Sequence, residues 1–256
     1  MILNKQTISK FLNQFFLVPL VLSGLAGVYG LAHANVVIEG TRIIYKEGSR
    51  DVTIKLTNSN QQKNALVQIW LDDGNSAATP EDAVSPFIVT PPLAKIPAGR
   101  NQAVRITYVG DKMKPDRESV FWFNMLEIPP KSNEPNVLSF AVRTRIKLFY
   151  RPKGILKTPV THGAKTEWQW KQSSKGLQVE VFNNSPYHLS FFEVGLDINQ
   201  SNVLVSGGGM VPPFERFVFD VPDRKEPPSE KITLKLKAVN DYGGEAASEH
   251  VLLPAK

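Results

Sequence analysis

The chain has 256 residues, enough for two domains of ordinary size, and its 42% hydrophobic and 21% charged residues are typical of a soluble globular protein. It contains no cysteine, so disulfides and thiolate sites are excluded and stability must come from packed cores. The formal net charge of +6 is too small and too dispersed to indicate a nucleic-acid partner.

The N-terminal segment has the layout of a secretory signal peptide. Lys5 and Lys10 precede an apolar stretch at residues 15–27, and an A-x-A sequence occupies residues 32–34. We predict that residues 1–34 are removed by cleavage after Ala34, which leaves no membrane attachment. The alternative is a retained anchor over residues 15–32, which are nearly long enough to span a bilayer. Cleavage would leave 28 of the 30 basic residues against 24 acidic ones, a net charge of +4.

From Asn35 onwards, short segments alternate between apolar and polar residues and are bounded by Gly, Pro, Asn, Asp and Ser. This period-two pattern predicts strands, and no window shows a sustained helical stripe. The predicted strands are 52–58, 65–73, 102–110, 119–128, 137–150, 177–184, 189–198, 216–221 and 231–240. Many short strands indicate an all-β fold built from sandwiches or barrels.

The clearest domain boundary is the sequence RPKGILKTP at residues 151–159, where two prolines and a glycine interrupt the strand pattern. It predicts a first domain at residues 35–152 and a second at 158–256. Each has about the size of an immunoglobulin-like sandwich. No sequence repeat relates the two halves.

Residues that could carry catalysis or bind metal are scattered. His162, His188 and His250 are far apart in sequence and are expected in loops or on the surface. Asp72 and Asp73, like the acids at 81–82, lie in turn-like segments and are interpreted as solvated loop charge. The glycines at 206–210 predict a turn. No nucleophile elbow or zinc-binding helix motif is present. We therefore expect no enzyme, catalytic residue, metal site or cofactor, although a hydrolase with a dispersed carboxylate pair remains an alternative.

The segment RTRIKLFYRP at residues 143–152 is a strand crowded with cations. Strand alternation places Arg143, Arg145 and Lys147 on one face and the residues at 144, 146 and 148 on the other. Charges of this kind blunt unwanted strand pairing, so Arg143 and Arg145 are expected to form a solvated edge.

Six segments together resemble a known family. They are IEGTRIIYKEG (38–48), DRESVFWFNMLEIPP (116–130), NVLSFAVRTRIKLFYRP (136–152), NNSPYHLSF (183–191), MVPPF (210–214) and AVNDYGG (238–244). They look like the two domains of PapD-like periplasmic chaperones of the chaperone–usher pathway. The short, cysteine-free segment at 128–136 resembles the short-loop branch of that family.

The resemblance implies two immunoglobulin-like β-sandwich domains in a boomerang arrangement, with a cleft between them. It implies a periplasmic chaperone that binds, folds and caps pilus subunits by donor-strand complementation and delivers them to an outer-membrane usher. Free chaperones that cap one another as a dimer are a further expected partnership.

The resemblance also assigns site residues. Leu138, Phe140 and Val142 match the donor residues that enter the subunit. Arg42 and Lys147 match the cations that bind the subunit's terminal carboxylate. An ionic cluster that joins the domains is implied for Glu118, Arg151 and Asp241.

The residues by themselves leave alternatives. The apolar side chains at 138, 140 and 142 also fit ordinary core packing, and Arg42 also fits a surface arginine. Lys147 stands at an odd-numbered position and the donor residues at even-numbered ones. On a regular strand it therefore faces away from them, unless a twist or bulge intervenes. A secreted two-domain adhesin or carbohydrate-binding protein is the alternative function, with sugar-stacking rings supplied by Trp70, Trp122, Trp168 and Trp170.

Overall fold

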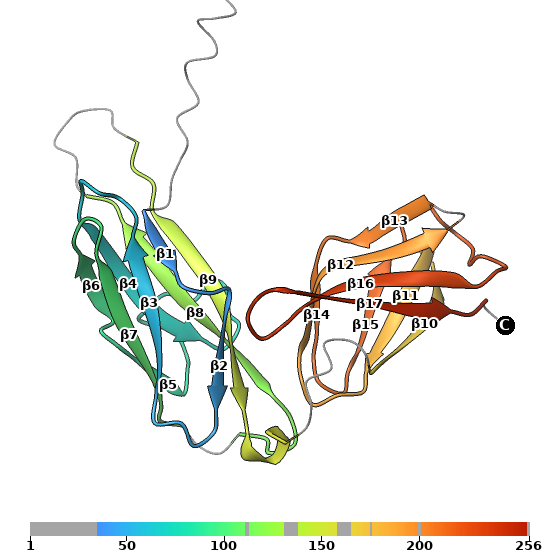
Figure 1. Ribbon diagram of the computed structural model, residues 1–256, viewed down its shortest axis with the longest axis horizontal. Coiled ribbons are helices and arrows are strands. Elements are labelled where there is room, and N and C mark those ends of the chain that lie inside the picture. Colours follow the sequence, from blue (N-terminus) through green and yellow to red (C-terminus); the bar gives the residue numbers. More distant parts are fainter. Residues whose placement is uncertain are drawn as a thin grey trace, which may run out of the picture. The chain divides into compact units, whose positions relative to one another are not determined.

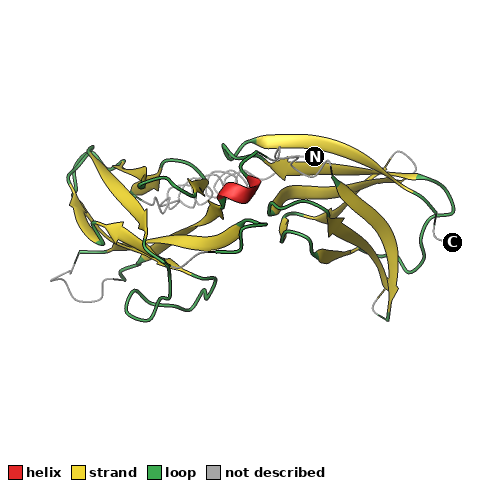
Figure 2. Cartoon of the chain, turned by 90° about the horizontal axis from the view of Figure 1, so that it is seen from below, coloured by secondary structure: helices red, strands yellow, loops and turns green. Residues whose placement is uncertain are grey.

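The computed structural model describes residues 35–110, 113–130, 138–157, 165–174, 176–198 and 201–254. The predicted signal peptide at 1–34, His162, and residues 131–136 of the short loop lie outside these ranges. Within them the chain folds into strands and one short 3-10 helix, Lys153–Ile155, which is red in Figure 2. No helix in the described ranges is long and apolar enough to cross a membrane.

Residues 35–151 form two sheets (Figure 1). The first has the order β1-β3-β7-β5, with β1 at Val36–Ile38, β3 at Val52–Asn58, β7 at Asn101–Tyr108 and β5 at Phe87–Thr90. The second has the order β2-β9-β8-β4-β6, with β2 at Arg42–Lys46, β9 at Val142–Arg151, β8 at Ser119–Ile128, β4 at Ala65–Asp72 and β6 at Leu93–Ile96.

Residues 166–252 form two further sheets. One has the order β10-β11-β15, with β10 at Thr166–Ser173, β11 at Gly176–Asn183 and β15 at Arg216–Asp220. The other has the order β13-β12-β16-β17, with β13 at Ser201–Ser206, β12 at Leu189–Ile198, β16 at Ile232–Val239 and β17 at Glu245–Leu252. Strand β14, Gly209–Val211, also pairs with β12.

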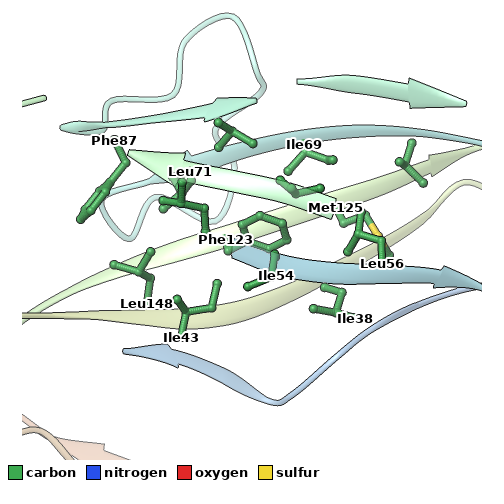
Figure 3. Close-up of a cluster of buried hydrophobic side chains, with 14 of the residues drawn as sticks. Ile38, Ile43, Ile54, Leu56, Ile69, Leu71, Phe87, Phe123, Met125 and Leu148 are labelled. Atoms are coloured by element: carbon green, nitrogen blue, oxygen red, sulfur yellow. The ribbon is translucent and has the colours of Figure 1, made fainter. Parts of the chain in front are cut away.

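Each pair of sheets encloses its own hydrophobic core, because alternate residues of every strand point inward. In the first core, Ile54 and Leu56 of β3 meet Phe123 and Met125 of β8, while Lys55 between the two β3 residues is exposed (Figure 3). Truncating a buried phenylalanine such as Phe123 to alanine typically costs about 3–5 kcal/mol. The second core contains alternating residues of β11 and β16.

Two buried asparagines hold equivalent places in the two cores, although the sequence shows no repeat. Asn58 ends β3, and its Nδ2 donates to the carbonyls of Lys63, Ile96 and Pro97 at 2.9–3.2 Å. Asn183 ends β11, and its Nδ2 donates to three carbonyls at 2.7–3.2 Å. Both side chains satisfy backbone groups that would otherwise be buried without a partner. The two halves therefore share a buried asparagine that caps backbone carbonyls, although no sequence repeat relates them.

The period-two pattern located all nine predicted strands, three of them (52–58, 119–128 and 189–198) with the bounds observed. The prediction for 137–150 was wrong at its start, because β9 begins at Val142 and Leu138 and Phe140 precede it. Eight strands were not predicted, and they are either short or rich in polar residues: β1, β2, β5, β6, β10, β13, β14 and β17. Gly207 and Gly208 separate β13 from β14, as the turn predicted at 206–210 requires.

Candidate functional site

Strand β9 presents its two faces to different surroundings. Leu148 and Tyr150 lie in the first core, and Ile146 packs against it. The odd-numbered residues from Arg143 to Arg151 therefore point to the opposite side of the sheet, as the alternation predicts. The three basic residues of the sequence pattern thus share one face outside the core.

The partners of β9 change along its length. Residues 147–151 pair with β2 in a parallel ladder, in which Arg42 is the Cα partner of Lys147. Residues 142–150 pair with β8 in an antiparallel ladder. Among the described residues, the stretch 142–146 consequently has a strand on one side only, and its other edge is open.

Arg42 and Lys147 line a cavity of about 470 Å³. Its walls come from both halves of the chain and include Trp122, Ser190, Phe191 and Val239. Arg42 Nη1 donates to the Val239 carbonyl at 3.2 Å, whereas its Nε is buried without a hydrogen-bond partner. The buried Ser190 hydroxyl also lacks a partner. Two residues that line the cavity therefore each carry a buried polar atom without a hydrogen-bond partner in the chain.

Two aromatic rings hold these cations. The Arg42 guanidinium lies over the Phe149 ring, with its Cζ 5.3 Å from the centroid. The Lys147 ammonium lies 5.5 Å from the centroid of the Trp122 ring. Ring faces attract cations without neutralising them, so the positive charge stays available to an anion.

Neither Arg42 nor Lys147 forms an ion pair with any described carboxylate. Burial lowers the pKa of Lys147, and the neighbouring charge of Arg42 lowers it further. Burial likewise lowers the pKa of Arg42, although the charges of Asp241 and Glu118 oppose this shift. Two desolvated cations without a counter-ion have the charge and the hydrogen-bond donors that an anionic group would require.

The predicted donor residues are exposed. Leu138 is 76% exposed, Phe140 is 72% exposed and Val142 is 41% exposed. They are not part of the core of the free chain, which removes the core-packing alternative. Large apolar side chains exposed one after another in a single segment commonly mark an interaction surface.

The structure brings Glu118, Arg151 and Asp241 together. Arg151 Nε donates to Glu118 Oε1 at 2.8 Å, and its two terminal nitrogens donate to the Asp241 oxygens at 2.6 Å each. Burial disfavours the charged Arg151, but the hydrogen bonds that it donates to Asp241 and the charge of Glu118 raise its pKa overall. The forked guanidinium thus bridges a carboxylate that immediately precedes β8 and one that follows β16.

His188 lies in the loop that precedes β12, as predicted, but it is not on the surface. Its side chain is buried, and its Nδ1 lies 3.0 Å from Glu118 Oε2. Its backbone N–H also donates to that oxygen at 2.9 Å. Glu118 and His188 are 70 positions apart, so no local sequence pattern could have predicted their contact.

Asp72 and the two arginines near the start of β9, Arg143 and Arg145, are not solvated as the sequence predicts. Asp72 is fully buried at the end of β4 and accepts hydrogen bonds from Arg145 and Asn124. Arg143 binds Asn124 Oδ1 through two nitrogens. The side chains of Arg143 and Arg145 are only 28% and 20% exposed, so they form no solvated edge.

Burial tends to raise the pKa of Asp72, but hydrogen bonds from Arg145, Asn124 and the Gly74 N–H hold that pKa below its usual value. Trp70 and Trp122 cover the cluster, with the guanidinium carbons of Arg143 and Arg145 at 4.8 and 4.1 Å from their ring centroids. These two rings are therefore occupied by arginines, while Trp168 and Trp170 pack against the second core.

Comparison with known proteins agrees with this architecture. Residues 35–156 match the family described as "Pili and flagellar-assembly chaperone, PapD N-terminal domain", and residues 163–250 match "Pili assembly chaperone PapD, C-terminal domain". The chaperone protein HifB of Haemophilus influenzae is 37% identical over 86% of this chain and 89% of its own. The probable fimbrial chaperone YadV of Escherichia coli is 37% identical over 82% and 87%.

Solved structures give the same result. The crystal structure of the YadV chaperone superposes with a TM-score of 0.74 at 34% identity, covering 86% of this chain and all of that one. The fold is thus that of a two-domain chaperone made of immunoglobulin-like β-sandwiches. The chain belongs to the PapD-like family of pilus-assembly chaperones, and it functions as a chaperone for pilus subunits.

The relatives are named chaperones, a family without enzymatic activity, so the hydrolase and adhesin alternatives are both wrong. No group of three or more metal-ligating side chains occurs within the described ranges. Sequence reasoning missed Ser190 and Asp72. No local motif distinguishes either residue, since their surroundings are assembled from distant strands.

Proposed function

We propose that this chaperone lends the N-terminal part of β9, with the residues before it, to a pilus subunit that lacks a strand. The observation that carries the proposal is the open strand edge at 142–146, flanked by exposed apolar residues on one side and counter-ion-free cations on the other. An added strand gains main-chain hydrogen bonds along such an edge, while alternating side chains fill pockets of the partner.

Leu138, Phe140 and Val142 would enter the groove of the subunit. Successive side chains on one face of a strand are about 6.6–6.8 Å apart, so three of them reach three consecutive pockets. Burying each large side chain contributes roughly 1.5–3 kcal/mol. Among the described residues, the segment at 138–141 has no strand partner, which supports its availability.

The C-terminal carboxylate of the subunit would bind Arg42 and Lys147. An α-carboxyl group titrates near 3.5, so it is fully charged at neutral pH. Charge-assisted hydrogen bonds to two desolvated cations are stronger than neutral ones. The unpartnered Ser190 hydroxyl in the same cavity would supply a third donor.

Lys147 stands at an odd-numbered position, and the donor residues stand at even-numbered ones. This difference is consistent with separate roles for the donor residues and the cations. Even-numbered residues of β9 continue the face that points into the sandwich, and odd-numbered ones continue the face that lines the cavity. The donor residues and the cations would therefore act on opposite faces of one strand. A bound carboxylate fixes the register, which decides which apolar residue meets which pocket.

The proposal extends to the cellular setting. The protein would work in the periplasm after cleavage behind Ala34, and it would hand its subunits to an outer-membrane usher. Domains at 35–152 and 158–256 would be held together by Arg151 with Glu118 and Asp241. A free chaperone would also be able to cap a second copy through the same exposed donor segment.

Peptide binding tests the carboxylate site. A peptide with the C-terminal sequence of a subunit is measured with a free and with an amidated terminus against the wild type, Lys147→Met and Lys95→Met. Lys95 is an exposed lysine of β6 and serves as the matched control. Amidation should weaken binding to the wild type and to Lys95→Met by at least tenfold and hardly affect Lys147→Met. Equal weakening in all three proteins would exclude Lys147 as the carboxylate ligand.

A further inference from the structure

The carboxylate of Glu127, near the end of β8, collects hydrogen bonds from the segment that leads into β1. Its Oε2 accepts from the backbone N of Asn35 at 3.1 Å and from the backbone N of Val36 at 3.3 Å. Its Oε1 accepts from the Asn35 side-chain Nδ2 at 2.6 Å. Both oxygens thus bind Asn35, and Oε2 also binds the next peptide nitrogen, that of Val36.

Asn35 is held on its other sides as well. Its carbonyl accepts from the Ser59 N–H at 2.7 Å and from the Ser59 hydroxyl at 2.8 Å. Its side-chain oxygen accepts from Asn60 Nδ2 at 3.1 Å. Every polar group of Asn35 therefore has a fixed partner. This is unusual for the first residue after the predicted cleavage site, because residues at a chain terminus are commonly poorly ordered.

No cation neutralises Glu127 within the described part of the chain. Its partners in the sheet are Val67 of β4 and Val142 of β9, and the loop after β3 contributes the uncharged Ser59 and Asn60. The charged residues nearest to it on this side are Lys55 of β3 and Glu39, which follows β1. They form an ion pair with each other at 3.0 Å. A half-buried carboxylate with three neutral donors gains most from a positive charge at one of those donors.

We infer that Glu127 is the receptor for the α-ammonium group that signal-peptide cleavage creates at Asn35. Cleavage consumes one water, and the Ala34–Asn35 peptide bond breaks into a carboxylate on Ala34 and an amine on Asn35. The amine takes up a proton, because α-amino groups titrate near 7.7–8.0. The amide donor 3.1 Å from Glu127 Oε2 thus becomes a cation in the same place.

The site lies beside the strand that carries the donor segment, since Glu127 is the Cα partner of Val142, the first residue of β9. Cleavage would therefore add an ion pair next to the open edge of β9 at residues 142–146. The mature protein would be more stable than its precursor for this reason, so processing and completion of the fold would be coupled.

A double-mutant cycle on the secreted protein tests this inference. One change is Glu127→Gln, which keeps hydrogen-bond acceptors and removes the charge. The other inserts one serine between Ala34 and Asn35, so that cleavage places the ammonium one residue away and leaves an amide at Asn35. Intact-mass measurement establishes that each product begins directly after Ala34, and nitrogen-15 NMR titration gives the pKa of the α-amine.

The α-amino pKa should be about one unit higher in the wild type than in Glu127→Gln, a tenfold change in proton affinity. Glu127→Gln should lower the urea midpoint clearly in the wild-type background and only slightly in the serine-inserted background. An ammonium whose folded pKa is raised stabilises fully below its unfolded pKa and loses this effect as the pH rises through the folded pKa. The difference between the two proteins should therefore shrink between pH 7 and pH 10.

Equal pKa values, or equal effects of Glu127→Gln in the two backgrounds, would reduce Glu127 to an acceptor of neutral hydrogen bonds and overturn the inference. The inference rests on the proposed cleavage site, so a mature chain that begins elsewhere overturns it too. Subunit capture by the same samples reports separately on the chaperone function, which would survive either outcome.

Discussion

Arg42 and Lys147 lie directly opposite each other in the parallel ladder between β2 and β9, and neither is paired with a carboxylate in the described part of the chain. Two like charges side by side in a partly desolvated cavity disfavour the folded state of the free protein. A folded chain tolerates such an arrangement where it is needed for binding. The free chaperone is therefore expected to be less stable with these residues than without one of them.

Lys147→Met should raise the urea midpoint of the free protein at pH 7 and abolish retention of subunits. The methionine keeps the stem that packs on Trp122 and removes the charge. Since the folded pKa of Lys147 is lowered, the wild type should gain stability as the pH rises from that value to the unfolded one near 10.4. Lys147→Met should lack this gain. A variant that is destabilised, or that still retains subunits, would contradict the prediction.

Phe140→Glu should leave the fold intact and prevent subunit capture. The side chain is largely exposed in the free chain, so a carboxylate there costs little until it must enter an apolar groove. Circular dichroism and a subunit pull-down measure the two effects. Val84→Glu, at a position that is 68% exposed and far from β9 in sequence, is the matched control and should capture normally. Unfolding of Phe140→Glu would restore the core-packing explanation.

Arg151→Ala should lower the free energy of unfolding by about 3–5 kcal/mol, because it leaves Glu118 buried without its cation. Arg151→Lys should lie between this variant and the wild type, since one ammonium cannot replace the fork that binds both carboxylates. Urea denaturation gives the values, and Arg50→Ala, at an exposed position, is the control. Wild-type stability of Arg151→Ala would exclude a structural role for the cluster.

Asp72→Asn should cost about 2–4 kcal/mol at pH 7, because it removes the charge that holds Arg145. A carboxyl group with a lowered folded pKa stabilises above its unfolded pKa, near 3.9, and ceases to do so as the pH falls through the folded value. The wild type and Asp72→Asn should therefore converge in acid. The neighbouring exposed Asp73→Asn should match the wild type at both pH values, and a constant difference for Asp72→Asn would refute the ionic account.

The alternation of apolar and polar residues predicted correctly which residues of a strand share a face, because this depends on the strand alone. Alternation alone put Leu148 and Lys147 on opposite faces, and in the structure Leu148 lies in the core while Lys147 lines the cavity. It failed for Leu138 and Phe140, which precede β9 and are exposed. Under the proposed function, their alternation would be used only when a subunit binds.

Residues whose role depends on distant neighbours could not be found in this way. Asp72 stands in a turn-like sequence, yet Arg145, 73 positions later, determines that it is buried as an ion. The same applies to His188 and Glu118, which are separated by 70 positions. For Arg151 and Asp241, family resemblance suggested the association and the structure supplies the distances.

The change of partners along β9 has a consequence for how such proteins diverge and can be engineered. Residues 147–151 pair with β2 and β8, whereas residues 138–141 have no strand partner among the described residues and Val142 pairs with β8 alone. Variation at 138–142 should therefore be under weaker folding constraints and, under the proposed function, follow the shape of the cargo. Exchanging only these five residues between two chaperones should transfer part of their preference for subunits without any redesign of the scaffold.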